Sequence, residues 1–280
     1  MAFVQGLREL GWIAGDNIEL DYRWAGADPV RARNFAAQLI ELKPDAIFAE
    51  STLGVAPLRE LTQTIPIVFV QIADPVGSGF VASLARPGGN IKGFTPFEFS
   101  LSGKLLEVLK EVAPQINRVD VIYNQNQAPQ IGMLRAVEAA APSLGVQVNA
   151  TSAGNADEIT QIIEALAGQP AAGVIVLPNP VTMGNRDLII ALMARYRLPA
   201  AYPFPFFARE GGLVAYGIDP ATQWHDAASY VDRVLKGAKP ADLPVQQPTK
   251  FQLTINLKTA KALGLQVPTF FQQRADEVID

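Results

Sequence analysis

Short apolar runs alternate with longer amphipathic segments along nearly the whole sequence, and this rhythm restricts the fold more than any other feature. The runs at residues 45–49, 65–72 and 118–123 are rich in apolar and β-branched side chains, which is typical of strands. Between them, as in residues 53–64, apolar residues recur at helical spacing. Strands that alternate with helices form right-handed βαβ units, whose parallel sheets are covered on both faces. The sequence therefore predicts an α/β fold.

The same rules assign the rest of the chain, with Gly, Pro and Asn clusters as breaks. The predicted strands are residues 17–22, 45–49, 65–72, 91–95, 118–123, 146–150, 172–177, 198–201, 213–217 and 251–255. The predicted helices are residues 1–11, 29–42, 53–64, 77–84, 100–112, 128–144, 157–167, 186–196, 220–235 and 257–263. A single sheet of ten or more strands is unusual, and the pattern changes near residues 94–99. We therefore expect two lobes of similar size.

Composition excludes several classes of function. The chain has no Cys, so thiol catalysis, disulfides, Cys-ligated zinc and iron–sulfur clusters are impossible within these 280 residues. His225 is the only His, which excludes multi-His metal sites, and we expect neither a metal nor a cofactor. The net charge is -4 without a basic run, so no surface favours nucleic acid. No apolar stretch approaches the roughly 20 residues that span a membrane.

In parallel sheets, ligands bind outside the carboxyl ends of the strands, where loops converge and helices begin. Ser51 and Thr52 follow one predicted strand and precede a helix, so their hydroxyls and the first-turn N–H groups are suited to a carboxylate. The alternative is an ordinary Ser/Thr N-cap. Asp74 follows the next strand, either to accept a hydrogen bond from a ligand ammonium or to cap a helix near Val76.

Other predicted strand ends carry neutral amides, one more acid and an aromatic segment. Asn124 and Asn126 follow residues 118–123, Asn179 follows residues 172–177, and Asp219 follows residues 213–217; each alone is ordinary loop chemistry. Residues 202–207 hold Tyr202, Phe204 and Phe206 between prolines, either as the wall of an apolar pocket or as core packing.

Signals of catalysis are weak. The sequence has no nucleophile elbow, no phosphate-binding P-loop and no dinucleotide fingerprint. Glu50 and Asp74 lie at two strand ends of one lobe, so a hydrolase with paired carboxylates is an alternative supported only by position.

Several long strings are more distinctive than any of these motifs. They are FVQGLRELGW at 3–12, NIELDYRW at 17–24, IPIVF at 65–69, ADPV at 73–76, LARPGGN at 84–90, DLPVQQPTKF at 242–251, INLKTAKALG at 255–264 and RADE at 274–277. Together they resemble the family of ABC-transporter substrate-binding proteins that includes tryptophan-binding members. The resemblance covers essentially the whole chain.

The resemblance implies a type I periplasmic-binding fold, with two Rossmann-like lobes joined by three crossovers and closing by a hinge on a small ligand. Lobe 1 would comprise residues 1–97 and 220–243, and lobe 2 residues 98–219 and 244–280. The implied function is that of an extracytoplasmic solute-binding protein of an ABC importer, without enzymatic activity, with a permease and an ATPase as partners. The expected ligand is a small amino acid or analogue, for example an aromatic one, and we expect a monomer. The alternative is a ligand-sensing module that regulates a partner protein.

The resemblance also implies roles for the strand-end residues. Ser51 and Thr52 would bind the ligand carboxylate, Asp74 or Asp219 the ammonium, and Asn124, Asn126 and Asn179 would complete the polar rim. Tyr202, Phe204 and Phe206 would face the ligand body.

One departure concerns the beginning of the sequence. Members of the family carry an export signal and a first β-strand before the helix that starts here at Phe3. We expect this chain to lack that strand, with a gap or a substitute contact in the sheet of lobe 1. The absent signal then gives no argument against a periplasmic or membrane-anchored location.

Overall fold

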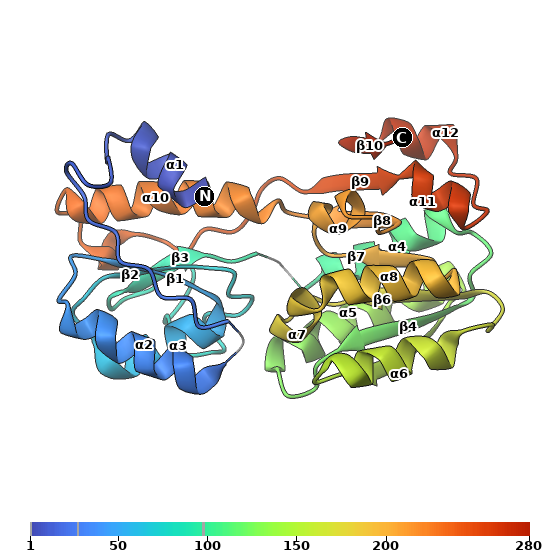
Figure 1. Ribbon diagram of the computed structural model, residues 1–280, viewed down its shortest axis with the longest axis horizontal. Coiled ribbons are helices and arrows are strands. Elements are labelled where there is room, and N and C mark those ends of the chain that lie inside the picture. Colours follow the sequence, from blue (N-terminus) through green and yellow to red (C-terminus); the bar gives the residue numbers. More distant parts are fainter. Residues whose placement is uncertain (1, 27, 97–98) are drawn as a thin grey trace. The chain divides into compact units, whose positions relative to one another are not determined.

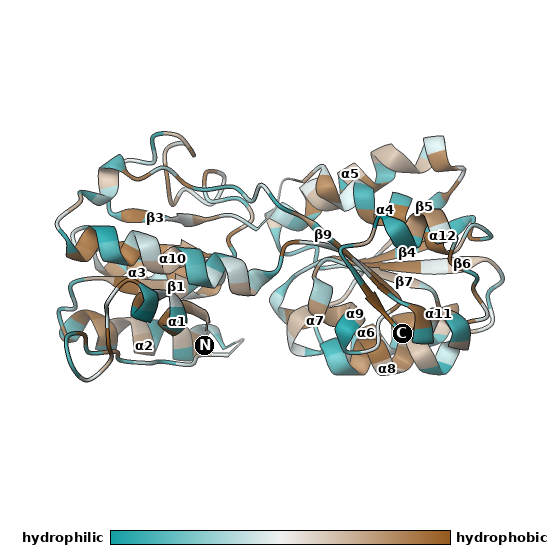
Figure 2. Cartoon of the chain, turned by 90° about the horizontal axis from the view of Figure 1, so that it is seen from above, coloured by the Kyte–Doolittle hydropathy of each residue, from teal (hydrophilic) through white to brown (hydrophobic). Residues whose placement is uncertain are grey.

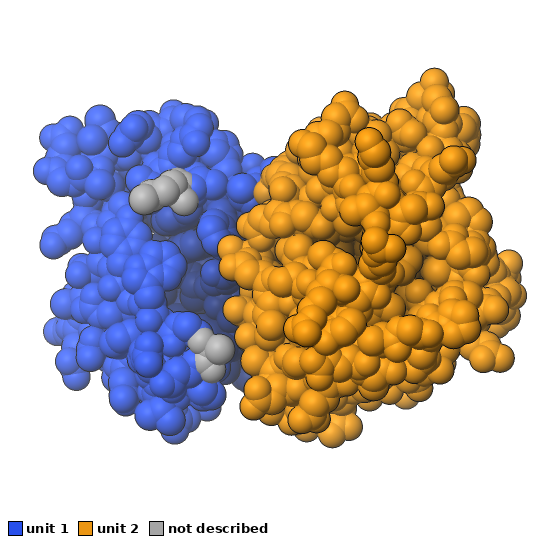
Figure 3. Space-filling model, turned by 45° about the vertical axis from the view of Figure 1, so that its right-hand side comes forward, with its two compact units in different colours: residues 1–97, 220–249 blue, residues 98–219, 250–280 orange. Residues whose placement is uncertain are grey.

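In the computed structural model, which describes residues 2–26, 28–96 and 99–280, helices and strands alternate along the chain as an α/β fold requires (Figure 1). The chain forms two units, defined by the contacts within each (Figure 3). Unit 1 is Met1–Phe97 with Pro220–Thr249, and unit 2 is Glu98–Asp219 with Lys250–Asp280. No helix in the described ranges is long and apolar enough to cross a lipid bilayer.

Unit 1 contains a three-stranded parallel sheet among its described residues, in the order β1-β2-β3. The strands are β1 (Ile47–Glu50), β2 (Ile67–Val70) and β3 (Ile91–Phe94). Every residue of β2 and β3 is buried, which explains why β2 (IVFV) is a continuous apolar run rather than an alternating one.

Helices cover both faces of the unit 1 sheet (Figure 1). On one face, α2 (Pro29–Glu41) and α3 (Ser51–Leu61) enclose a core that includes Val55 and Phe69. On the other face, α1 (Ala2–Glu9) and α10 (Pro220–Leu235) enclose a core that includes Leu7 and Val68. The two helices approach closely at Gly6, where an added Cβ would lie 2.6 Å from the carbonyl oxygen of His225.

The predicted strand at residues 17–22 is wrong. This segment is extended, but its only pairing in the described part of the chain is a bridge between Ala14 and Ile18. A strand is defined by a hydrogen-bonded neighbour, and none of the described strands runs along this segment. Its alternating apolar residues Ile18 and Leu20 still pack against the core between α1 and α10, which explains the strand-like pattern.

The predicted helix at residues 77–84 is also wrong, and the segment is a series of turns. The Asp74 carboxylate accepts a hydrogen bond from the Gly77 N–H at 2.7 Å, and Gly79 has a left-handed φ of 69°. A left-handed residue interrupts a right-handed helix. Phe80 and Val81 are buried by the loop, so their apolar character reflects burial without a helix.

Unit 2 contains a seven-stranded sheet in the described residues, in the order β10-β9-β8-β7-β6-β4-β5. All neighbouring strands are parallel except β8 and β9. The strands are β4 (Arg118–Tyr123), β5 (Gln147–Ser152), β6 (Ala172–Val176), β7 (Ala200–Tyr202), β8 (Val214–Gly217), β9 (Gln252–Asn256) and β10 (Glu277–Ile279).

The longer helices of unit 2 lie on opposite sides of this sheet, with α4 (Leu101–Val112) and α5 (Ala128–Leu144) on one side (Figure 2). On the other side lie α6 (Ala156–Leu166) and α8 (Arg186–Tyr196). The short elements are α7 (Pro180–Gly184), α9 (Pro205–Arg209), α11 (Leu257–Ala262), α12 (Thr269–Gln273) and, in unit 1, a 3-10 turn at Pro240–Asp242. The helices α7, α9 and α12 and the strand β10 were not predicted, because each is too short to show a period.

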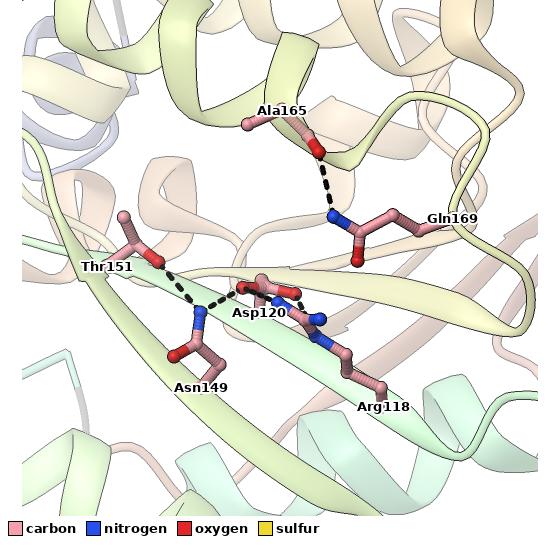
Figure 4. A network of polar contacts seen from close by, with 6 residues as sticks. All are labelled: Arg118, Asp120, Asn149, Thr151, Ala165 and Gln169. Carbon is pink, nitrogen blue, oxygen red and sulfur yellow. Dashed lines mark hydrogen bonds and ion pairs between the residues drawn. The ribbon is translucent and has the colours of Figure 1, made fainter.

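One carboxylate is buried within the sheet of unit 2 (Figure 4). Asp120, in β4, is 1% exposed, and its Oδ2 lies 3.2 Å from Nε of Arg118 on the same strand. Asn149, in register on β5, donates to the other carboxylate oxygen and also contacts the Thr151 hydroxyl. The charge is therefore paired and hydrogen-bonded, as a buried carboxylate requires.

Candidate functional site

The three strands of unit 1 end in register at one edge of the sheet. Glu50 pairs with Val70, and Val70 pairs with Phe94. The next residues after β1 and β2 are Ser51 and Gln71, and both have a left-handed backbone, with φ of 65° and 60°. Such a conformation costs a non-glycine residue on the order of 1–3 kcal/mol and is concentrated at ligand sites. Two adjacent strand ends thus share an unusual backbone geometry.

Ser51 and Thr52 begin α3 without capping it. The N-cap position is Glu50, whose side chain makes no capping hydrogen bond. Within the described residues, neither the Ser51 nor the Thr52 hydroxyl has a hydrogen-bond partner, so the N-cap alternative is not what the structure contains. The first N–H groups of an α-helix lack intrahelical partners and carry a partial positive charge. These hydroxyl and amide donors are together suited to bind an anion.

Glu50 and Asp74 have different surroundings at this edge of the sheet. Loss of solvent around the Glu50 carboxylate raises its pKa above the ordinary value of 4.5, although the side chain stays exposed. Asp74 is half-buried and holds the turn at Gly77, and its backbone carbonyl accepts a further bond from Ser78 at 3.0 Å. The capping role considered for Asp74 is therefore present, although it closes a turn instead of starting a helix.

A buried amide network at this edge was not predicted from the sequence. Gln223, in α10, is 5% exposed. Its Oε1 accepts a hydrogen bond from Nε2 of Gln71 at 2.8 Å, and its own Nε2 donates to the backbone carbonyl of Thr95 at 2.6 Å. Gln223 thus joins the ends of β2 and β3 to the first turns of α10. Nothing in the residue types signals this network, because the partners are distant in sequence.

In unit 2, Asn124 and Asn126 follow β4 as predicted and form a local turn. Oδ1 of Asn124 accepts the N–H of Asn126 at 3.0 Å, while Asn124 is 8% exposed and Asn126 is exposed. This bond uses the carbonyl end of the Asn124 side chain. The side-chain N–H groups of Asn124 remain able to donate to another acceptor.

Asn179 is occupied by the structure around it. It is 4% exposed, and its Oδ1 accepts the N–H groups of Val181 and Thr182 in a capping box that begins α7. Behind it, the fully buried Gln130 of α5 donates to the Pro178 carbonyl at 2.8 Å and contacts Asn179 Nδ2. Asn179 therefore shapes the loop after β6.

Asp219 already has a cationic partner. Its Oδ2 lies 3.4 Å from Nη1 of Arg209, and Arg209 also binds Glu277 at 2.9 Å. The hydrogen bond to Glu277, followed by smaller contributions from Asp219, raises the pKa of the guanidinium above its ordinary value, so Arg209 stays charged. Much of the Asp219 charge is therefore compensated within unit 2.

The aromatic segment divides between core and surface. Tyr202 is fully buried and stacks on Phe207 with 4.8 Å between ring centroids, and burial raises the pKa of its hydroxyl. Phe204 and Phe206 stack on each other at 5.5 Å. Phe206 is half-buried and lies under the guanidinium of Arg186. The core-packing alternative thus describes Tyr202 and Phe204, which is 3% exposed, whereas Phe206 stays partly exposed.

Comparisons with known proteins agree with this fold. Residues 2–279 match the family described as ABC transporter substrate binding protein. The chain is 27% identical to the tyrosine-binding protein of Clostridioides difficile over 265 residues, which are 94% of this chain and 76% of that protein.

Solved structures of other proteins have a similar fold. A conserved domain protein from Vibrio cholerae superposes with a TM-score of 0.91 at 26% identity, covering 99% of this chain and 93% of that one. An ABC domain from Streptococcus pneumonia in complex with L-Trp also gives a TM-score of 0.91, at 23% identity and with the same coverage. Because the family match extends over essentially the whole length, this chain belongs to the family of ABC transporter substrate-binding proteins.

Proposed function

We propose that this protein binds an aromatic amino acid outside the cytoplasm and delivers it to the permease and ATPase of an ABC importer. The observation that carries the proposal is the uncapped start of α3, where the Ser51 and Thr52 hydroxyls have no partner among the described residues. A relative named for tyrosine binding and a similar structure holding L-Trp support the ligand class.

In this proposal the ligand carboxylate binds Ser51, Thr52 and the first N–H groups of α3. Charge-assisted hydrogen bonds from such donors are the strong ones, and the helix dipole adds to them. Asp74 is the better acceptor for the ligand ammonium than Asp219, because Arg209 compensates the charge of Asp219. Asn124 and Asn126 supply neutral donors.

The aromatic body of the ligand packs against Phe206 in the same proposal. Phe206 is half-buried and stacks on the buried Phe204, and an aromatic ring favours a further ring over an aliphatic chain. Tyr202 and Asn179, which are buried and locally bonded, support this surface and the neighbouring loop without touching the ligand.

We further propose that units 1 and 2 are lobes that close on the ligand by a hinge. The chain passes from one unit to the other at residues 97–98, 219–220 and 249–250, so a rotation needs changes at a few backbone positions only. The protein acts as a monomer, and it releases the ligand unchanged because recognition is its only chemistry.

Isothermal titration with L-tryptophan, tryptamine and indole-3-propionate tests this function. Tryptamine lacks the carboxylate and indole-3-propionate lacks the ammonium, so each should bind at least about tenfold more weakly than L-tryptophan. Equal affinity for L-tryptophan and tryptamine would exclude the carboxylate site at α3. Absence of binding to both L-tryptophan and L-tyrosine would exclude the ligand class.

Single-residue variants test whether the Ser51 hydroxyl causes the preference for L-tryptophan over tryptamine. Ser51→Ala should reduce the preference for L-tryptophan over tryptamine, because the lost hydroxyl contacts only the carboxylate. Ser229→Ala is the matched control, since its hydroxyl bonds the Asp226 carbonyl at 2.7 Å on the exposed side of α10. Ser229→Ala should show the same preference for L-tryptophan over tryptamine as the wild type.

A further inference from the structure

Gln223 is held by hydrogen bonds at both ends of its side-chain amide. Its Nε2 donates to the Thr95 carbonyl at 2.6 Å, and its Oε1 accepts from Gln71 Nε2 at 2.8 Å. The side chain is 5% exposed, so neither bond can be exchanged for water without opening the unit. Because a buried amide that loses a partner is costly, this bridge holds Gln71 in one orientation.

Gln71 has capacity for a ligand. It is the first residue after β2, is half-buried and keeps a left-handed φ of 60°. Its Oε1 has no hydrogen-bond partner in the described residues, and one Nε2 hydrogen remains beyond the bond to Gln223. In sheet register it stands beside Ser51, at the edge where the carboxylate is proposed to bind. An amide held at this edge can both donate and accept.

The same bridge reaches the segments that lead out of unit 1. Thr95 lies shortly before the passage at residues 97–98, and Gln223 shortly after the one at 219–220. Thr95 N–H also donates to the Gln246 carbonyl at 2.9 Å, and Gln246 N–H donates to the Gly93 carbonyl at 2.9 Å. Gln246 precedes the passage at 249–250. Gln223 and these hydrogen bonds therefore connect Gln71 to residues close to each of the segments that join the units.

We propose that Gln71 is a ligand-contacting amide and that Gln223 is the positioning residue that couples it to these hinge segments. This inference rests on the proposed function. A ligand that binds the Gln71 amide stabilises the bridge to Thr95, and the bridge in turn orders the backbone where the hinge begins. The same chain of hydrogen bonds within unit 1 thus contacts the ligand at one end and the hinge segments at the other.

The test measures the Kd for L-tryptophan and L-tyrosine by titration, together with amide hydrogen exchange at residues 93–96 and 244–248. Gln71→Met should weaken binding at least about tenfold and should also lower Tm, because it leaves the buried Oε1 of Gln223 without its donor. Gln223→Met should weaken binding similarly and abolish ligand-induced protection of the Thr95 and Gln246 amides. The double variant should bind no more weakly than the weaker single variant, since the two residues act through each other.

Asn256→Leu is the matched control for losing a buried amide. Asn256 is 4% exposed, donates to the Ala208 carbonyl at 2.9 Å and accepts from Thr259 N–H at 2.9 Å. It ends β9, which runs antiparallel to β8, so it lies at the sheet edge opposite the carboxyl ends of β7 and β8. This variant should lower Tm and leave the Kd within about twofold.

The outcomes separate the two proposals. If the wild type binds neither amino acid, the proposed function fails. If the wild type binds but Gln71→Met keeps its Kd within about twofold, the function stands and the role of Gln71 is refuted. Unchanged protection at Thr95 in Gln223→Met would refute the coupling. Should Gln223→Met not fold, Gln71→Met gives the same exchange test, because it removes the other end of the bridge.

Discussion

His225 on α10 holds its Nε2 at 2.8 Å from Oε2 of Glu9 on α1. The hydrogen bond to Glu9 is the main reason that the pKa of His225 is raised above 6.5, and it also lowers the pKa of Glu9 below 4.5. Gln5 donates to Glu9, and Asp226 lies 3.5 Å from the other ring nitrogen of His225. The pair therefore fastens α1 to α10 in a pH-dependent way.

We expect this pair to stabilise unit 1 most between roughly pH 4.5 and 6.5. The contribution of His225 is present below its unfolded pKa and is lost as pH rises through the raised folded pKa. The contribution of Glu9 is lost as pH falls through its lowered folded pKa. The Tm difference between wild type and His225→Gln should peak in this window and decline as pH rises through the raised folded pKa of His225. A difference independent of pH would contradict the ion pair.

Ser51→Gly should stabilise the protein by about 1 kcal/mol, because glycine adopts the left-handed φ of 65° without strain. Chemical denaturation measures the change in the free energy of unfolding. Ser229→Gly is the control of opposite sign, since it places glycine inside α10 and should cost about 0.5 kcal/mol. Destabilisation by Ser51→Gly would mean that the serine hydroxyl has a structural partner.

Lys92 is a buried cation in β3, with 1% exposure and one hydrogen bond from Nζ to the Gly88 carbonyl. Burial lowers its pKa from 10.5 to about 8. The folded state therefore loses this proton at lower pH than the unfolded state, and stability should rise as pH increases from about 8 to 10.5. Lys92→Met should abolish this rise and stabilise the protein at pH 7 by on the order of 2 kcal/mol. An identical pH dependence in the variant would show that Lys92 reaches solvent.

Asp120→Ala should destabilise unit 2 by about 2–4 kcal/mol, because it leaves Arg118 and Asn149 without their buried acceptor. Denaturant unfolding followed by circular dichroism measures the loss. Arg118→Ala should cost at least as much, because it leaves the buried Asp120 carboxylate without its cationic partner. A clearly smaller loss in Arg118→Ala than in Asp120→Ala would contradict this expectation.

Most of the fold could be predicted from local patterns. The helices at residues 29–42, 100–112 and 128–144 and the strands at 118–123 and 172–177 were predicted nearly to the residue, because their periods are long or their apolar runs continuous. The two wrong elements, at residues 17–22 and 77–84, show the limit of this reasoning. Both carry apolar residues that pack against the core, and burial alone does not specify which backbone buries them.

For the candidate site, the sequence determined where to look and the tertiary structure decided what each residue does. Position after a buried strand singled out Ser51 and Asp74, because the carboxyl ends of parallel strands meet at one edge. Only the folded chain shows that Asp74 holds a turn and that Ser51 caps nothing. The bond from Gln71 to Gln223 joins residues far apart in sequence, and no local pattern specifies such a contact. Local propensity acts over a few residues, whereas long-range hydrogen bonds depend on the packing of the whole unit.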